Sequence, residues 1–499
     1  MSGLNRNAGA TSPHEYARPI MTVTHKRSVI ADDTRRRDFA IVFAVMMAVA
    51  AGNSGLQSVL PAIGREIGIP DPFVAGIFSL SALLWTVSAP IWARASDRRG
   101  RKPLIAIGLL GFVVSMTGCA VIVLAGLHKL IGPLVVFIGF ALMRSLFGLI
   151  GSASNPAGQA YVADRTSKAE RTDALATLAG AFGVGTVLGP AIAPYFVLPG
   201  VSFSGPMFAF AVAALVCLVI VLRMLPPSEI PKHRSFEAEG AGRKSVLQFG
   251  LWKNPKVAPF LWYGFLVGSA QAVNGYTLGF LVIDKVHMTP AQAQGFIQVA
   301  MMGGAVAGLM AQWGLIRIFH MKPNHLLLWG AGLAGLGNLF ITLAPNYGAV
   351  VTAYALTSIG FGFARPGFTA GASLAAPAGG QGDVAGAITA VNGSCIIITP
   401  ILGVWLYDHF HWAPFAINTM VLAAMVGVVL TNRELIDAGR APDAGLEAEV
   451  TDPAQVGLGE TPRPVPPVMS PSGAISQLGR RLRAVRRLEA RRKKARLRP

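Results

Sequence analysis

Six of the polar side chains inside long apolar stretches of the sequence are candidates for ligand binding, because an unsatisfied polar group is costly there. They are one arginine and five amides: Arg144, Asn53, Gln57, Gln271, Asn274 and Asn392. An amide both donates and accepts hydrogen bonds, and a guanidinium binds anionic groups. This set of side chains suits the binding of a small neutral, zwitterionic or anionic molecule. It holds no nucleophile paired with a base and no metal-ligand spacing, so it does not indicate an enzyme.

The spacing of these amides would place them on shared helix faces. Asn53 and Gln57 are four residues apart, and Gln271 and Asn274 are three apart in the corresponding stretch of the second half of the chain. Residues at these separations lie on one side of a helix. We therefore expect the amides to line a substrate cavity together with Arg144. Hydrogen bonding between packed helices is an alternative role for each amide.

A charged motif, Ala-Arg-Ala-Ser-Asp-Arg-Arg-Gly-Arg-Lys-Pro, occupies residues 93–103 between two apolar stretches. Gly100 would allow a tight turn, Asp97 could face the N-terminus of a neighbouring helix, and the cations could bridge to acidic helix ends. The motif resembles the G-x-L-a-D-r-x-G-r-k sequence of the major facilitator superfamily. Ala93 and Ala95 replace the first glycine and the leucine of that pattern, whereas its D-R-x-G-R-K core is intact.

This resemblance implies a gate on the cytoplasmic side of the membrane. In the family, the loop holds that side closed in one conformational state. The gating residues would be Asp97, Arg98, Gly100, Arg101 and Lys102, with Asp164 and the segment near Gly382 as their partners. The alternative is a simple positively charged anchor, which would need neither the aspartate nor the glycine.

Two further motifs carry the same resemblance. The sequence Arg-Ser-Leu-Phe-Gly that begins at Arg144 is similar to the R-x-x-q-G motif of the family, with Phe147 in the glutamine position. Gly185, Gly189 and Pro190 match the G-x-x-x-G-P element of its antiporters, with Ala-Pro replacing the trailing glycine pair. Small residues at this spacing let helices approach closely, and the proline would kink its helix. The resemblance covers residues 39–432, is closest to the twelve-helix drug:proton antiporters, and favours export.

The sequence departs from those antiporters in the position of its acidic residues. Many drug exporters of this family carry a carboxylate in their first span, where this chain has Asn53 and Gln57. We place every acidic residue in a tail, a loop or a span end. If transport is coupled to a proton, the carrier is then peripheral, and the candidates are Asp97, Asp284, Asp383 and Asp408.

The elements that must position these residues are membrane-spanning helices. Of the 499 residues, 53% are hydrophobic and 13% charged, and the mean hydropathy is +0.52. Soluble domains carry about 25% charged residues. Apolar stretches long enough to cross a bilayer recur along the chain, and each must be helical to satisfy its own backbone. We predict an all-α membrane protein whose twelve spans lie near 39–62, 72–95, 103–127, 131–161, 172–196, 204–225, 257–284, 290–319, 323–344, 347–375, 382–408 and 412–432.

The spans divide into two pseudo-symmetric bundles of six helices. Pro156 and Pro366, Asp173 and Asp383, Gly183 and Gly393, and Pro190 and Pro400 stand at one constant separation, in the same ordinal spans of each half. Such duplication is a transporter architecture with the substrate between the halves. The predicted parts are an N-terminal tail 1–38, a first bundle 39–225, a linker 226–256, a second bundle 257–432 and a C-terminal tail 433–499.

The basic residues predict how the chain is oriented. Nearly all of the 43 Lys and Arg residues fall in the two tails and in alternate loops, whereas the other loops hold only Arg65, Lys129 and Lys285. The positive-inside rule then puts both termini in the cytoplasm, in an inner membrane of bacterial type. The formal charge of +19 is thus no sign of nucleic-acid binding. The basic segment 478–499 is either an amphipathic helix on anionic lipid or a solvated topology signal.

These patterns favour a secondary-active exporter of a small organic molecule that works by alternating access. The partners we expect are the substrate, the lipid bilayer and a coupling proton. We expect a monomer with no cofactor or metal. A facilitator or symporter that imports a sugar or an organic acid is the main alternative, and a receptor that borrowed the fold is another. The chain lacks the phosphate-binding loop of an ATP-driven pump.

Overall fold

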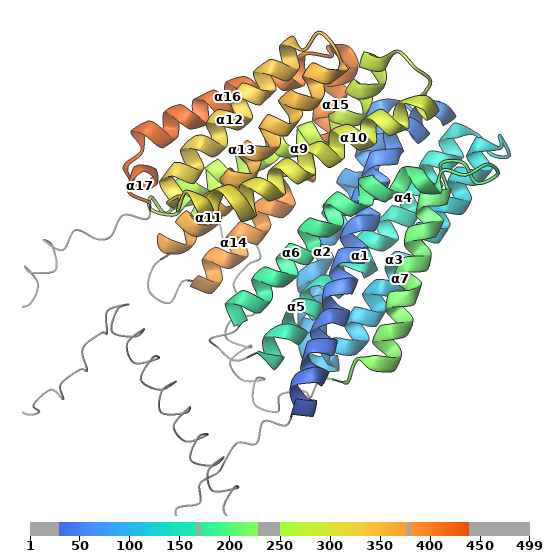
Figure 1. Ribbon diagram of the computed structural model, residues 1–499, viewed down its shortest axis with the longest axis horizontal. Coiled ribbons are helices and arrows are strands. Elements are labelled where there is room, and N and C mark those ends of the chain that lie inside the picture. The colour runs from blue at the N-terminus through green and yellow to red at the C-terminus, as the bar shows by residue number, and fades with distance from the viewer. Residues whose placement is uncertain (1–28, 167–170, 228–249, 377–380, 439–499) are drawn as a thin grey trace, which may run out of the picture. The chain divides into compact units, whose positions relative to one another are not determined.

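The structure is a computed structural model that describes residues 29–166, 171–227, 250–376 and 381–438 (Figure 1). Within these ranges, 12 helices are long and apolar enough to cross a membrane. Their limits agree with the twelve predicted spans to within a few residues at most ends, and the prediction of an all-α membrane fold is confirmed. The basic segment 478–499 and residues 228–249 of the predicted linker 226–256 lie outside the described residues.

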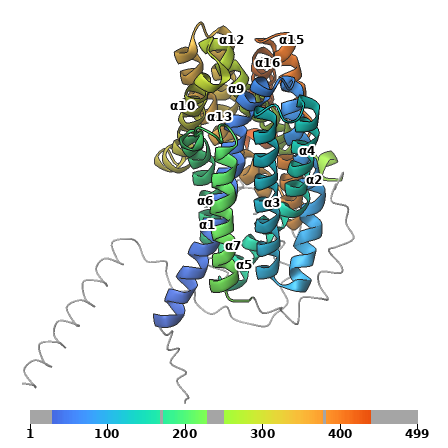
Figure 2. The same cartoon turned by 90° about the vertical axis from the view of Figure 1, so that its right-hand side faces the viewer.

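The first half contains six spans. They are formed by α1 (Val29–Ile67), α2 (Asp71–Arg99), α3 (Arg101–Leu127), α4 (Pro133–Ile150) continued through η1 (Gly151–Ala153) into α5 (Ser154–Arg165), α6 (Arg171–Ile192) continued into η2 (Ala193–Phe196), and α7 (Gly205–Met224). Helix α1 contacts both α6 and α7, and α7 also contacts α3 (Figure 2).

The second half repeats this order. Its spans are α9 (Ala258–Val286), α10 (Pro290–Leu309) continued through η4 (Met310–Leu315) into α11 (Ile316–Ile318), α12 (Pro323–Leu343), α13 (Tyr347–Leu374), α14 (Gln381–Ser394) with α15 (Thr399–His409), and α16 (Ala413–Thr431). Two short elements flank them, η3 (Leu251–Lys253) and α17 (Arg433–Ile436).

Helix α2 is longer than its sequence suggested. We expected the second span to end near residue 95, but the helix continues through the charged motif to Arg99, and α3 begins at Arg101. Charged residues that extend a helix beyond the apolar core are invisible to a hydropathy search. Gly100 alone joins the two helices with a φ of 92°, a conformation that favours glycine because it has no side chain. We call the end with this turn the Asp97 end, and the opposite end, where α1 meets α2, the Arg65 end.

The two halves meet through equivalent helix pairs. Helix α6 contacts α10, and α14 and α15 contact α2, so the fifth span of one half lies beside the second span of the other in both cases. The matched glycines take part in these contacts. A side chain added at Gly183 would meet Leu309 on α10, and one added at Gly393 would meet Thr86 on α2. Gly183 and Gly393, which the constant sequence separation relates, thus both lie where the fifth span of one half contacts the second span of the other.

Glycines on α6 allow it to approach α1 very closely. A Cβ atom at Gly185 would lie 2.4 Å from the carbonyl oxygen of Met47, and one at Gly189 would lie 2.2 Å from that of Ala51. The hydroxyl of Ser54 donates a hydrogen bond to the carbonyl of Gly185 at 3.4 Å. Such contact is possible only where one partner has no side chain, and it fixes α1 within the first half.

We expect Gly189→Ala to destabilise the protein, because the added methyl group would force α1 and α6 apart. Overpacking of this kind costs about 1–3 kcal/mol. The melting temperature of the detergent-solubilised protein should fall measurably. Gly427→Ala on α16 is the matched control, because a Cβ atom there meets nothing within 4 Å. Equal melting temperatures for the two variants would contradict the close packing of α1 and α6.

Candidate functional site

Arg144 is buried in the first half with only part of its hydrogen-bonding capacity used. Its side chain, on α4, is 2% exposed. Its Nη2 donates to Oδ1 of Asn53 on α1 at 2.6 Å. The rings of Phe147 and Phe78 lie 4.6 and 5.4 Å from the guanidinium carbon. Nε and Nη1 have no hydrogen-bond partner in the part of the chain that the structure describes.

Close packing of α2 on α4 brings these groups together. The hydroxyl of Ser81 donates to the carbonyl of Arg144 at 3.0 Å. A Cβ atom at Gly148 would lie 2.5 Å from the carbonyl oxygen of Ser81, so only glycine permits this approach. Phe78 lies one turn before Ser81 on α2, and Phe147 one turn after Arg144 on α4. The two rings are thus delivered by the helices that hold the arginine.

The charge of Arg144 lacks a counter-charge. None of the ion pairs recorded among the described residues involves it. A buried cation without a partner loses its hydration, and two aromatic faces and one amide oxygen replace that hydration only in part. The two unpaired nitrogens can therefore donate to a further acceptor. A carboxylate, phosphate, sulfonate or enolate oxygen is the acceptor that a guanidinium prefers.

Phe78 also connects this site to the second half. Its ring packs against Tyr276 of α9 with 5.1 Å between ring centroids. One helical turn further along α1, Nε2 of Gln57 donates to the carbonyl of Gly275 at 3.2 Å. Arg144 and Asn53 therefore lie one residue away from the boundary between the halves. Phe78 and Tyr276 were missed by sequence reasoning, because an aromatic residue in an apolar span carries no signal of its own.

The structure divides the six polar residues of the predicted cavity. It brings Arg144, Asn53 and Gln57 to the boundary between the halves. It places Asn274, 1% exposed, in an amide cluster within the second half, where its Oδ1 accepts from Asn418 at 2.9 Å. Asn418 also donates to Asn338 at 3.4 Å. This favours the packing role for Asn274 that the sequence left open. Gln271 is exposed, and Asn392 is partly buried on α14.

The charged motif forms a cluster at the Asp97 end. Arg101, 6% exposed, donates from Nε to Asp164 at 3.0 Å and from Nη1 to the hydroxyl of Ser96 at 3.1 Å. Its Nη1 also lies 2.6 Å from Asp97, four residues earlier. These contacts join α2, α3 and α5 within the first half. Lys102 donates to the carbonyl of Leu222 on α7 at 2.9 Å, while Arg98 is exposed. Gly382 lies in the first turn of α14, and its surroundings lie outside what the structure describes.

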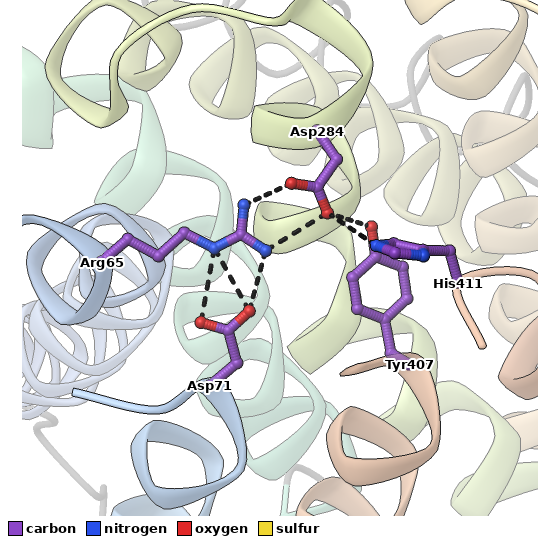
Figure 3. Close-up of polar contacts among 5 residues, drawn as sticks. All are labelled: Arg65, Asp71, Asp284, Tyr407 and His411. Carbon is purple, nitrogen blue, oxygen red and sulfur yellow. Dashed lines mark hydrogen bonds and ion pairs between the residues drawn. The ribbon is translucent and has the colours of Figure 1, made fainter. Parts of the chain in front are cut away.

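A second charged cluster, at the Arg65 end, was not predicted as a unit. Arg65 contacts Asp71 of its own half and Asp284 of the second half (Figure 3). The sequence drew attention to Asp284 only as a proton carrier and to Arg65 only as an outer loop cation. Their meeting depends on the tertiary arrangement of α1 and α9. Asp408, another of the suggested proton carriers, is exposed at the same end.

The comparisons with known proteins decide the family. Residues 42–400 match the family model described as Major Facilitator Superfamily. The chain belongs to this superfamily. It is therefore an integral multi-pass membrane protein of a transporter family rather than an enzyme family. The membership that the sequence motifs predicted is thereby confirmed.

Curated relatives of this superfamily member include drug-resistance proteins of bacteria. The chain is 27% identical over 75% of its length to Multidrug resistance protein 1 of Bacillus subtilis, of which it covers 90%. It is 22% identical over 78% of its length to Tetracycline resistance protein, class D, of Salmonella ordonez, of which it covers 94%.

Solved structures agree on the fold. The human organic anion transporter MFSD10 matches 79% of this chain and 99% of its own, with 18% identity and a TM-score of 0.56. The nucleoside transporter NupG matches 81% of this chain and 98% of its own, with 10% identity and a TM-score of 0.62. Identities this low establish the shared fold alone.

We expect Asn274→Ala to lower the melting temperature and to leave transport intact, because Asn274 bonds within the second half. Hydrogen bonds between membrane helices contribute about 0.6 kcal/mol on average. Gln271→Ala on the same helix is the control. Its exposed amide has no such partner among the residues that the structure describes, so its removal should leave the melting temperature unchanged. Loss of transport by a stably folded Asn274→Ala protein would restore Asn274 to the substrate site.

Proposed function

We propose that the chain is a secondary-active exporter of small drug-like molecules that are neutral or anionic, working by alternating access between its two halves. The observation that carries the proposal is the buried guanidinium of Arg144, with two unpaired nitrogens, beside the boundary of the halves. A transporter core with an unbalanced positive charge repels cationic drugs and favours molecules that carry an acceptor or a negative charge.

The names of the relatives support export. Proteins that confer multidrug or tetracycline resistance are related to this chain over most of its length. The glycine-proline element of α6 also supports export, because it resembles that of antiporters in the superfamily. Import of a sugar or organic acid finds no comparable support. Both termini are cytoplasmic in this proposal, which puts the Asp97 end inside and the Arg65 end outside.

In the proposed binding mode the ligand supplies the hydrogen-bond acceptors that Arg144 lacks. Its acceptor oxygens take the hydrogens of Nε and Nη1, and Asn53 supplies an amide that donates as well as accepts. Phe78 and Phe147 provide apolar faces for a planar ligand. Because Phe78 packs on Tyr276, separation of the halves at this point uncovers the guanidinium. Ligand entry and movement of the halves are thus the same event.

Proton coupling must then use a carboxylate away from the middle of the spans. Asp97, Asp284, Asp383 and Asp408 are the candidates in this proposal, and each lies near the end of a helix. Asp97 and Asp164 share Arg101, so protonation of either would weaken the cluster that joins α2, α3 and α5. In this proposal the motif keeps the gating role at the cytoplasmic end that its resemblance to the family implies.

Asn53→Asp should both stabilise the fold and abolish transport of anions. The new carboxylate would stand 2.6 Å from Nη2 of Arg144 and would supply the missing counter-charge. Hydrogen bonds to charged groups are worth about 1.5–3 kcal/mol, so we expect a melting temperature a few degrees higher. Transport of anionic compounds should fall at least roughly tenfold, because the site is already neutralised.

Gln57→Glu is the matched control for this variant. It makes the same amide-to-carboxylate change one turn along α1, where the side chain bonds the carbonyl of Gly275 instead of a cation. It should lower the melting temperature. If Asn53→Asp neither stabilised the protein nor reduced anion transport, the anion site at Arg144 would be refuted.

Transport into everted vesicles tests the direction, the substrate class and the coupling together. We expect neutral and anionic members of a chemically diverse panel to accumulate when a pH gradient is imposed. Accumulation should collapse when the gradient is dissipated. Uptake that prefers right-side-out vesicles would establish import, and a rate indifferent to the gradient would remove the proton from the mechanism.

A further inference from the structure

Five side chains at the Arg65 end form a continuous polar network that crosses from one half of the molecule to the other (Figure 3). They are Arg65 on α1, Asp71 on α2, Asp284 on α9, Tyr407 on α15 and His411 in the turn that follows it. The network lies far along α1 from the Asp97 end and shares no residue with the charged motif there.

Each half holds its own contribution in place. In the first half, Asp71 receives Nη2 of Arg65 at 2.8 Å and Nε at 3.2 Å, a two-pronged contact that fixes the plane of the guanidinium. In the second half, the hydroxyl of Tyr407 donates to Oδ2 of Asp284 at 2.6 Å, and Nε2 of His411 lies 3.6 Å from the same oxygen. Both partners are oriented before they meet.

The crossing contact joins Arg65 to Asp284. Nη1 of Arg65 pairs with Oδ1 of Asp284, and Nη2 lies 3.2 Å from Oδ2. The guanidinium also lies 5.3 Å from the ring centre of Phe280, one turn earlier on α9. The Arg65 and Asp284 side chains are 23% and 31% exposed, so water screens this pair less than it would screen a pair on an open surface.

Apolar and backbone contacts close the same end beneath the network. A Cβ atom at Gly279 of α9 would lie 2.5 Å from Pro61 of α1. Nε2 of Gln294 on α10 donates to the carbonyl of Ser58 at 3.3 Å, and Nε2 of Gln298 donates to that of Ala191 at 2.5 Å. Ser58 and Gln294 are both almost fully buried. The network therefore caps a closed seam between the halves.

We propose that Arg65, Asp71, Asp284 and Tyr407 form a latch, the Arg65 latch, which holds the halves together at this end and must open each time that end opens. The proposal rests on the alternating access of the proposed function. It identifies the ion pair that stabilises the state in which the Arg65 end is closed. When this end opens, Arg65 stays with Asp71, and Asp284 keeps Tyr407 and His411 as its partners. The carboxylate of Asp284 then becomes exposed to water, and its ion pair with Arg65 is lost.

The test measures opening directly and needs no substrate. Ser58→Cys is the reporter, in a chain whose Cys119, Cys217 and Cys395 are replaced by serine. Ser58 is fully buried in the seam, and its replacement leaves the carbonyl that accepts from Gln294 unchanged. Protein in lipid nanodiscs, accessible from both faces, is treated with a polar maleimide, and the labelling rate reports the population with an open seam.

We expect Asp284→Asn and Arg65→Gln each to raise the labelling rate of the reporter about tenfold. The double variant should label no faster than either single one, because both remove the same contact. Asp408→Asn is the matched control. It removes a carboxylate from the same end, near enough to Asp71 to repel it, but makes no ion pair or hydrogen bond with Arg65 among the described contacts. It should not raise the rate, because it relieves a repulsion between the halves instead of removing an attraction.

A cysteine at Leu130, 77% exposed, should label at one rate in every background, which verifies the reagent and the fold. The proposal would be overturned if the Ser58→Cys reporter labelled slowly in both latch variants while the cysteine at Leu130 labelled at its usual rate. Equal acceleration by Asp408→Asn would also overturn it, because general charge at this end would then be responsible. A labelling result in favour of the latch, combined with absent transport in vesicles, would mean that only the proposed function has failed.

Discussion

The packing of the first half depends on one constraint. The guanidinium of Arg144 is buried among membrane helices with no counter-charge among the described residues. Among the described residues, its recorded hydrogen-bond and ring partners are Asn53 and two phenylalanine rings. Around so costly a group, four helices approach more closely than ordinary side chains allow, and they do so at glycines. Gly148 brings α2 onto α4, and Gly185 and Gly189 bring α6 onto the helix that carries Asn53. The packing of the first half is thus organised around one unsatisfied charge.

That charge distinguishes the chain from the antiporters that its sequence resembles. Where those place a carboxylate in the first span, this chain presents an amide that bonds an arginine. In the proposed function, this buried positive charge is the reason that neutral and anionic molecules are favoured. Among the described residues, aspartates at the ends of the spans share arginines with neighbouring helices.

The sequence revealed the spans because apolar length is a local property, and it revealed the turn at Gly100 because a motif encodes it. It marked Arg144 and Asn53 because polarity in an apolar stretch is conspicuous. It could not reveal Phe78 or Tyr276, which look like any other apolar or aromatic residue until two helices bring them together. It also could not distinguish Asn274 from Asn53. Both are amides in spans, and only the presence of Asn418 and Asn338 around one of them separates their roles.

Helix α2 has a mechanical consequence. It is a single helix of 29 residues, about 43 Å long, with Asp71 in its first turn and Asp97 in its last. A tilt of about 10° about its midpoint would move its two tips by roughly 4 Å in opposite directions. One rod thus touches the charged clusters at both faces of the membrane, and a shift that loosens one tip displaces the other. Its weak point is Pro90, nearer the Asp97 tip, where the missing backbone hydrogen bond allows the rod to flex.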